Sequence, residues 1–270
     1  MRVRRMTYYA PAELGQAVKA KVAAVRASGE RIDYLTFVPD GEPSLDTSLE
    51  AHIREVRPLG IPIAVITNAS LMWREDVRRA LALADWVSVK VDAANEPLWR
   101  RLDRPHGALR LEDILNGALA FARSFQGTLV TETMLVDGVN TGEAILQEIA
   151  AFVIKLAPSR SYFSVPSRPP AEPWVRPPSD QVLASAVRLF RASGQPCEGL
   201  GEYEGNHFVL TGEVVDDLMS ICAVHPMRED AVREFVKNAG MDWRIVDNLV
   251  KTGKMLVQTH QGQRFYRTSH

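Results

Sequence analysis

Five short apolar runs, each followed by a polar turn and an amphipathic segment, divide most of the chain into units of about 30 residues. The runs have the length and the β-branched and aromatic content of buried strands. Strands that alternate with amphipathic helices form βαβ units, in which the strands lie parallel in one sheet. The predicted strands are residues 34–38, 61–67, 86–91, 128–136 and 161–165, and the predicted helices are residues 11–28, 45–56, 75–84, 111–125, 143–156 and 180–192.

The number of units and the first turn favour an incomplete βα barrel over a dinucleotide-binding fold. A complete barrel of this type has eight units, which is more than this chain provides. A dinucleotide-binding fold places a Gly-x-Gly-x-x-Gly motif after its first strand, and no such motif follows residues 34–38. We therefore predict an α/β partial TIM-like barrel over residues 1–193.

The pattern changes after Gly194, and we predict a linker over residues 194–211. Residues 205–211 within it are interpreted either as a strand returning to the barrel or as part of the connection. Three helical patterns and a hairpin pattern around Gln261-Gly262 follow, which is the layout of a winged-helix domain. The predicted domain covers residues 212–270, with helices at 214–223, 228–239 and 242–252 and a hairpin at 254–267.

The balance of acidic and basic residues in this C-terminal domain limits the classes of partner that it can bind. Residues 212–270 contain eight acidic and eight basic side chains, so the basic stripe of a DNA-binding domain is absent from the sequence. A protein-interaction or substrate-orienting module is therefore favoured over a nucleic-acid reader. The net charge of −1 for the whole chain also predicts no strong attraction to nucleic acid or to an anionic membrane.

Three further features bear on location. No apolar run approaches the ~20 residues of a membrane helix. The first six residues include three arginines but are not followed by the apolar segment of a signal peptide. The two cysteines, Cys197 and Cys222, provide no disulfide framework and no metal-ligand spacing, so the cytoplasm is the expected compartment.

Polar side chains recur where the predicted strands end. One such turn is ordinary turn chemistry, and an acid in the first turn of a helix favours the helix dipole. Acids, amides, hydroxyls and an arginine at the same end of several strands instead indicate a shared polar cavity, which is where βα barrels carry their sites. Lys90 and Glu132 lie inside otherwise apolar runs and either face this cavity or point outward between helices. The candidate residues are Asp40, Gly41, Glu42, Pro43, Thr67, Asn68, Ser70, Lys90, Asp92, Glu132 and Arg168.

Six segments, in order along residues 1–192, resemble the radical S-adenosylmethionine (SAM) superfamily. Within it they are most similar to the Fe–S oxidoreductases related to the wyosine-base synthesis enzymes. Residues 37–45 resemble the "GGEP" segment of the superfamily, although Pro39-Asp40 stands where two small residues are commoner. The other segments are residues 66–71, 90–93, 103–106, 132–136 and 167–172.

The resemblance implies a partial (βα)6 barrel, lacking its first strand in this chain, that binds SAM. Residues 40–43 would receive the methionine amino group, with Glu42 accepting a hydrogen bond. Thr67, Asn68 and Ser70 would line the ribose and carboxylate region. Lys90 and Asp92 would face the nucleoside, and Glu132 and Arg168 would lie on the substrate side.

The resemblance also exposes a departure, because the superfamily holds a [4Fe–4S] cluster with a Cys-x3-Cys-x2-Cys motif that this chain lacks. In the family, the segment that follows the cluster loop is similar to residues 2–11. We expect the chain to begin downstream of that loop, as a fragment or from an internal methionine; a shortened relative that has lost the chemistry is the competing interpretation.

Two functions therefore stand as predictions. The first is a radical SAM enzyme of unknown substrate, which forms a 5′-deoxyadenosyl radical in its full-length form and is inactive as this chain alone. The alternative is a non-catalytic barrel that binds SAM or another nucleoside and signals to a protein partner through its C-terminal domain.

Overall fold

The computed structural model describes residues 3–38, 41–200, 213–224, 226–260 and 262–269. It divides into two compact units. The first unit comprises Met1–Lys19, Asp33–Pro166 and Trp174–Gly201, and the second comprises Ala20–Ile32, Ser167–Pro173 and Glu202–His270. The strand considered for residues 205–211 lies outside the described residues, and the predicted domain boundaries stay predictions.

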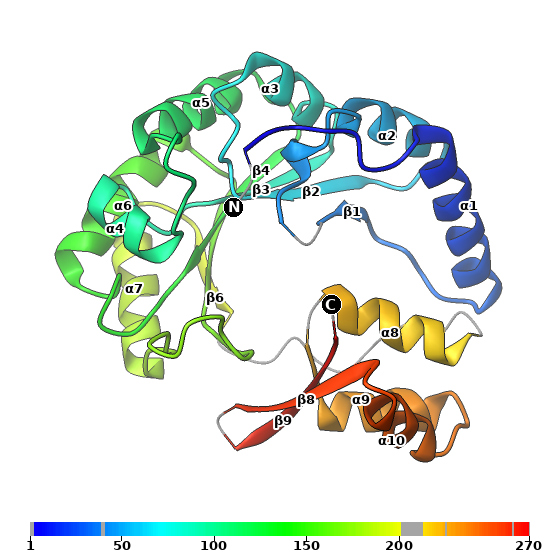
Figure 1. Ribbon diagram of the computed structural model, residues 1–270. Helices are drawn as coiled ribbons and strands as arrows, with labels where there is room; N and C mark the ends of the chain where they lie inside the picture. Colours follow the sequence, from blue (N-terminus) through cyan, green and yellow to red (C-terminus); the bar gives the residue numbers. More distant parts are fainter. Residues whose placement is uncertain (1–2, 39–40, 201–212, 225, 261, 270) are drawn as a thin grey trace. The chain divides into compact units, whose positions relative to one another are not determined.

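A six-stranded parallel sheet forms the centre of the first unit (Figure 1). Its strands are paired in the order in which they occur in the sequence, as in a βα barrel, whereas a doubly wound sheet reverses its order. The fold is thus α/β and consistent with a partial TIM-like barrel. The strands are β1 (Leu35–Phe37), β2 (Ile63–Thr67), β3 (Trp86–Lys90), β4 (Thr128–Met134), β5 (Arg160–Ser164) and β6 (Cys197–Leu200).

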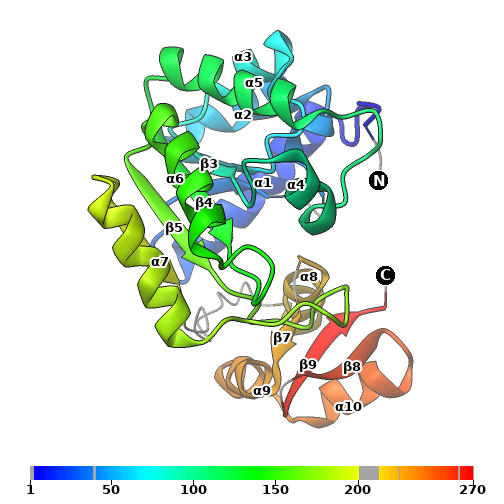
Figure 2. The ribbon, with the colours of Figure 1, turned by 90° about the vertical axis from the view of Figure 1, so that its left-hand side faces the viewer.

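Helices flank this sheet along its outer face (Figure 1; Figure 2). They shield apolar side chains of the strands, among which Ile63, Val65 and Val87 are completely buried. No helix in the described part of the chain is long and apolar enough to cross a membrane. The helices are α1 (Pro11–Ala27), α2 (Leu49–Val56), α3 (Glu75–Leu81), α4 (Glu96–Leu102), α5 (Leu111–Ser124), α6 (Glu143–Leu156) and α7 (Asp180–Ala192).

Three elements of the first unit differ from the sequence prediction. The helix predicted from residue 45 begins only at Leu49, because the 3₁₀ turn η1 (Pro43–Leu45) precedes it and Asp46 is extended. Helix α4 was not predicted, and β6 supplies a sixth strand at residues 197–200 that was not predicted either. A second 3₁₀ turn, η2 (Arg57–Leu59), ends α2.

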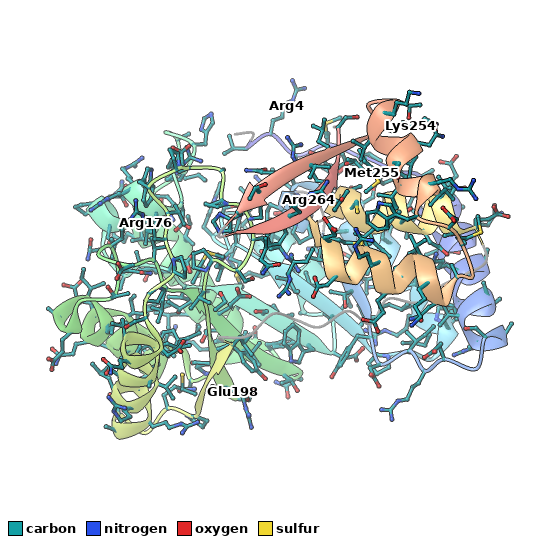
Figure 3. All side chains as sticks on the ribbon, turned by 90° about the horizontal axis from the view of Figure 1, so that it is seen from below. Arg4, Arg176, Glu198, Lys254, Met255 and Arg264 are labelled. Atoms are coloured by element: carbon teal, nitrogen blue, oxygen red, sulfur yellow. The ribbon has the colours of Figure 1, made fainter. Side chains whose placement is uncertain are left out.

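The second unit contains a separate core of helices packed on a small sheet. Phe235, Met255 and Tyr266 are among its buried side chains. Strands β8 and β9 pair antiparallel with His260 opposite Gln263, in agreement with the predicted hairpin, and Figure 3 labels Met255 and Arg264 on its two strands. The elements are α8 (Val214–Val224), β7 (Met227–Arg228), α9 (Glu229–Asn238), α10 (Arg244–Lys251), β8 (Met255–His260) and β9 (Gln263–Thr268), with strand order β7-β9-β8.

Candidate functional site

A cavity of about 650 Å³ lies in the first unit, where residues that follow β1, β2 and β3 meet the connection between α4 and α5. This is the carboxyl end of the strands, the position at which α/β barrels bind their ligands. Six of the predicted residues line it: Gly41, Glu42, Asn68, Ser70, Lys90 and Asp92.

The other predicted residues are placed differently. Thr67 and Pro43 are buried behind the cavity wall, and Glu132 lies beside Lys90 without lining the cavity. Arg168 belongs to the second unit, so its predicted role stays a prediction. Asp40 lies outside the described residues.

Glu42 joins the ends of β1 and β2. Its side chain caps η1, with Oε1 accepting from the Ser44 backbone N–H at 3.0 Å. The same oxygen accepts from the Thr67 hydroxyl at 2.6 Å, and Oε2 accepts from the Asn68 N–H at 2.7 Å. Burial raises the pKa of the Glu42 carboxyl, and these hydrogen bonds oppose that rise by favouring the ionised form.

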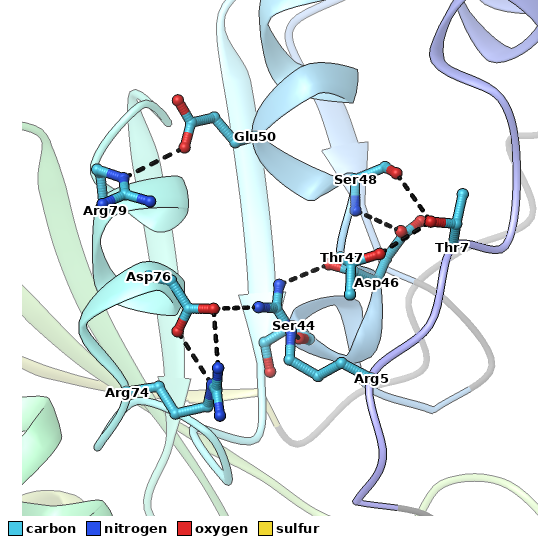
Figure 4. Close-up of polar contacts among 10 residues, drawn as sticks. All are labelled: Arg5, Thr7, Ser44, Asp46, Thr47, Ser48, Glu50, Arg74, Asp76 and Arg79. Atoms are coloured by element: carbon cyan, nitrogen blue, oxygen red, sulfur yellow. Dashed lines mark hydrogen bonds and ion pairs between the residues drawn. The ribbon is translucent and has the colours of Figure 1, made fainter.

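Arg5 holds the turn that carries Glu42 (Figure 4). Its Nε donates to the Ser44 carbonyl at 2.7 Å and its Nη2 to the Asp46 carbonyl at 2.8 Å. Its Nη1 pairs with Asp76 at 2.5 Å, and Arg74 pairs with the same carboxylate. The N-terminal segment is therefore tied to η1 and α3, an interaction that the sequence analysis did not anticipate.

Lys90, at the end of β3, lies between the carboxylate of Asp92 and that of Glu132 on the neighbouring strand β4. Its Nζ is 3.5 Å from Asp92 Oδ2 and 3.6 Å from Glu132 Oε1, and Glu132 also accepts from the Ser164 hydroxyl at 2.8 Å. Burial tends to lower the pKa of Lys90, but the neighbouring carboxylates outweigh it and the pKa is raised. Lys90 therefore presents a protonated ammonium group at the cavity wall.

Asp103 completes a carboxyl pair that the sequence analysis missed. It caps the C-terminus of α4, lines the cavity and forms a side-chain hydrogen bond with Asp92. Burial, followed by the charge of Asp92, raises the pKa of Asp103 to about 8. Residues 103–106 were noted in the sequence for their family resemblance, and the acid at position 103 was the feature that could have identified this site residue.

Asn140 fixes the backbone on which Asp92 sits. Its Nδ2 donates to the Asp92 carbonyl at 3.1 Å and to the Met134 carbonyl at 2.8 Å, and its Oδ1 accepts from the Val136 N–H at 2.7 Å. Asp92 Oδ1 in turn accepts from the Met134 N–H at 2.7 Å. Asn140 is completely buried, so this amide is a structural tie between the ends of β3 and β4.

The lining suits a cationic ligand with several hydrogen-bonding groups. Glu42, Asp92 and Asp103 supply three carboxyls, whereas Lys90 is the one lining side chain with a fixed positive charge among the described residues. Trp99 and Tyr8 add aromatic surface that can contact a flat ring.

The described residues offer no site for a metal cluster. No group of three or more His, Cys, Asp or Glu side chains in that part of the chain is arranged to hold a metal ion. Cys197 and Cys222 are buried in different units, and burial raises their pKa values to about 11 and about 12. A [4Fe–4S] cluster needs several thiolate ligands, so it does not fit the residues of this chain.

Comparison with known proteins gives relatives in sequence and in fold, although no family model matches. A UPF0026 protein of Methanocaldococcus jannaschii is 37% identical over 266 residues, which is 98% of this chain and 82% of the relative. A UPF0026 protein of Helicobacter pylori strain J99 is 32% identical over 198 residues, covering 73% of this chain and 63% of that protein.

Two solved structures show the fold of the first unit. A radical SAM methyltransferase from Sphaerobacter thermophilus has a TM-score of 0.56 and 22% identity, covering 73% of this chain and 59% of that one. TYW1 with a lysine-pyruvate adduct has a TM-score of 0.54 and 14% identity, covering 71% of this chain and 65% of that one. The fold is therefore that of radical SAM enzymes.

Proposed function

The chain belongs to the UPF0026 family, and we propose that its first unit binds SAM as the cofactor-binding barrel of a radical SAM enzyme whose substrate is unknown. Two features support the proposal: the radical SAM fold and the acidic cavity at the carboxyl ends of the strands. SAM carries an ammonium, a carboxylate and a sulfonium, so its net charge of about +1 complements three carboxyls and one lysine.

The acidic cavity is the observation that carries the proposal. Glu42 has an oxygen, Oε2, that accepts only one hydrogen bond from the described residues and can accept another from the methionine ammonium group. Asn68 and Ser70 offer polar groups toward the ribose and carboxylate, and Asp92 offers a carboxylate to the nucleoside. Glu132 and Arg168 are assigned to the substrate side on the family resemblance.

SAM, when bound in a radical enzyme, supplies a 5′-deoxyadenosyl group that can remove a hydrogen atom from a substrate. The residues of this chain bind the cofactor, orient it by hydrogen bonds at fixed strand ends and exclude water from the cavity. Reductive cleavage of SAM requires cluster ligands from outside these 270 residues, because the chain has only two cysteines.

Binding of SAM to the purified chain tests the proposal. Asp92→Asn keeps the acceptor for the Met134 N–H but removes a cavity charge, so we expect at least about tenfold weaker binding by isothermal titration calorimetry. The matched control is Asp113→Asn, an exposed position on α5, which should bind as the wild type does. Absence of SAM binding to the folded wild-type protein would refute the proposal.

The second candidate is a barrel that binds SAM or another nucleoside without cleaving it, and the lack of a three-cysteine motif favours it. The two functions differ in a chain extended ahead of residue 1 by a Cys-x3-Cys-x2-Cys segment. Under reducing conditions, a radical enzyme converts SAM to 5′-deoxyadenosine and methionine, which chromatography detects. A binding barrel returns the SAM intact.

For the second unit we infer a winged-helix-like module that contacts a protein partner or orients the substrate. Three helices with a terminal hairpin support this assignment, as does the balanced charge of residues 212–270. Binding to duplex DNA, measured by fluorescence anisotropy at several salt concentrations, should be weak, because no basic stripe is available to displace counterions. Strong salt-dependent DNA binding would overturn the inference.

A further inference from the structure

The carboxyls of Asp92 and Asp103 share a hydrogen bond inside the cavity. Two ionised carboxylates are both acceptors, so a hydrogen bond between them requires that one carries a proton. Asp92 is 6% exposed and its other oxygen already accepts from the Met134 N–H, which fixes its direction. The shared proton is therefore held at a defined place beside the ligand space.

The ammonium group of Lys90 lies beside this pair and is shared with a further carboxylate. This ammonium lies 3.5 Å from Asp92, which follows β3, and 3.6 Å from Glu132 on β4, so one cation serves both carboxylates. The charged groups that act directly on Asp103 are Asp92 and Lys90. Lys90 is the last residue of β3, and Asp92 lies two positions beyond it. One cation thus lies beside several carboxyls, so a proton on the Asp92–Asp103 pair would reduce the repulsion between them.

Besides Lys90 and the Asp92–Asp103 pair, three titratable side chains of the described residues line the cavity. Glu42 is hydrogen bonded to Ser44, Thr67 and Asn68 in its own turn. His106 accepts from the Ala108 N–H through Nδ1 at 3.1 Å. Tyr8 contributes a phenol to the lining.

We propose that the Asp92–Asp103 pair is the counter-charge for the sulfonium nucleoside, and that binding of SAM releases the proton shared by the two carboxyls to solvent. The proposal rests on SAM being the ligand of this cavity, and it adds Asp103 to the binding residues. A cation placed beside two carboxyls stabilises their doubly ionised form, as a metal ion or an arginine does. The bound cation thereby replaces the proton.

This exchange gives SAM affinity a defined pH dependence. In the free protein the pKa of Asp103 is raised to about 8, so Asp103 keeps its proton below about pH 8. The complex favours the ionised form and has a lower pKa, so affinity rises with pH below about 8, by up to about tenfold per pH unit, and then levels off. The opposite slope would mean that the ligand prefers the protonated pair.

The experiment is isothermal titration of the full chain with SAM at pH 7 in two buffers, phosphate and Tris, which differ in their enthalpy of protonation. A difference in the observed heat measures the protons released per SAM bound. We expect release of about one proton or a large fraction of it for the wild type. We expect distinctly less with S-adenosylhomocysteine, which has no sulfonium charge.

Asp103→Asn identifies the source of the proton. The asparagine is uncharged, so the variant should bind SAM with no buffer-dependent heat, whereas the exposed control Asp113→Asn should release protons like the wild type. Release that persists in Asp103→Asn assigns the proton to another group and overturns the proposal.

The wild type alone also decides the matter if the variant fails to fold. Equal heats in the two buffers, or equal proton release with S-adenosylhomocysteine, would refute the exchange while leaving SAM binding intact. No SAM binding at all would refute both this proposal and the proposed function.

Discussion

Glu42 combines a structural role with a place on the cavity wall. Its two carboxylate oxygens accept from Ser44, Thr67 and Asn68, so three donors from two strand ends depend on one side chain. A glutamine at this position replaces one acceptor oxygen by a donor group, which would face another donor.

We therefore predict that Glu42→Gln lowers the free energy of unfolding by about 1–3 kcal/mol, measured by urea denaturation at pH 7. The control is Glu112→Gln, since Glu112 is 72% exposed and its ion pair with Arg110 lies at the surface. That change should stay within about 0.5 kcal/mol. Equal effects of the two substitutions would contradict the structural role of Glu42.

The raised pKa of Asp103 predicts how its contribution to stability changes with pH. The folded protein binds this proton up to about pH 8, whereas the unfolded chain releases it near the ordinary value of 3.8. The folded state therefore binds more protons over this interval, so the Asp103 contribution to stability falls as pH rises from about 4 to about 8.

Asp103→Asn removes that dependence. Its free energy of unfolding, relative to the wild type, should be higher at pH 8 than at pH 5 in urea denaturation. For Asp113→Asn, the difference from the wild type should be the same at both pH values. A wild-type advantage that grows toward pH 8 would show that Asp103 is ionised in the folded protein.

Among the helices, α5 depends on a glycine where it approaches another backbone segment. A Cβ at Gly117 would lie 2.4 Å from the Met72 carbonyl carbon and from the Trp73 nitrogen. Both are main-chain atoms, so the contact is not relieved by turning a side chain. The close approach packs α5 on the connection between β2 and α3.

We predict that Gly117→Ala destabilises the protein by about 1–3 kcal/mol in urea denaturation, although alanine is favoured over glycine by about 1 kcal/mol within helices. The steric clash outweighs the helix propensity here. Gly107→Ala is the control, because nothing lies within 4 Å of its added Cβ. A stabilised Gly117→Ala protein would show that α5 does not pack this closely.

Most elements of the first unit could be predicted from the sequence because their patterns are local. Strand β2 is a run of apolar residues, and the predicted bounds of α6 and α7 agree with the structure. Helix α4 was missed because it has seven residues and a proline in its first turn. Strand β6 was missed because its sequence, Cys-Glu-Gly-Leu, has no alternating pattern.

The site could be predicted only as far as strand ends define it. Asn68 and Asp92 directly follow or border strands, so their approach follows from the parallel sheet. Asp103 reaches Asp92 only because α4 turns back over the cavity, and Arg5 reaches Ser44 across 39 positions of sequence. Neither of these two contacts could be predicted from the spacing of residues along the sequence.

For the molecule as a whole, the two cysteines set a limit on iron–sulfur chemistry. Cys197 and Cys222 are buried, and burial raises their pKa values to about 11 and about 12, which disfavours the thiolate that iron requires. We predict that anaerobic reconstitution with iron and sulfide gives no stoichiometric cluster on this chain, as measured by iron content and visible absorption.

The control for reconstitution is the double variant Cys197→Ser and Cys222→Ser, which should bind the same background amount of iron. Ellman's reagent should label both thiols rapidly only after denaturation. One [4Fe–4S] cluster per chain whose electron paramagnetic resonance spectrum responds to SAM would contradict the prediction.

The connection from β3 to α5 has a consequence for how such a barrel diversifies. It leaves the sheet after Lys90, forms α4 and delivers two acids, Asp92 and Asp103, to the cavity before α5 begins. The hydrogen-bonded ladder between β3 and β4 contains none of these residues. Exchange of this single excursion between homologues would therefore retune the electrostatic preference of the cavity while the scaffold keeps its register, which makes it a natural target for engineering altered cofactor selectivity.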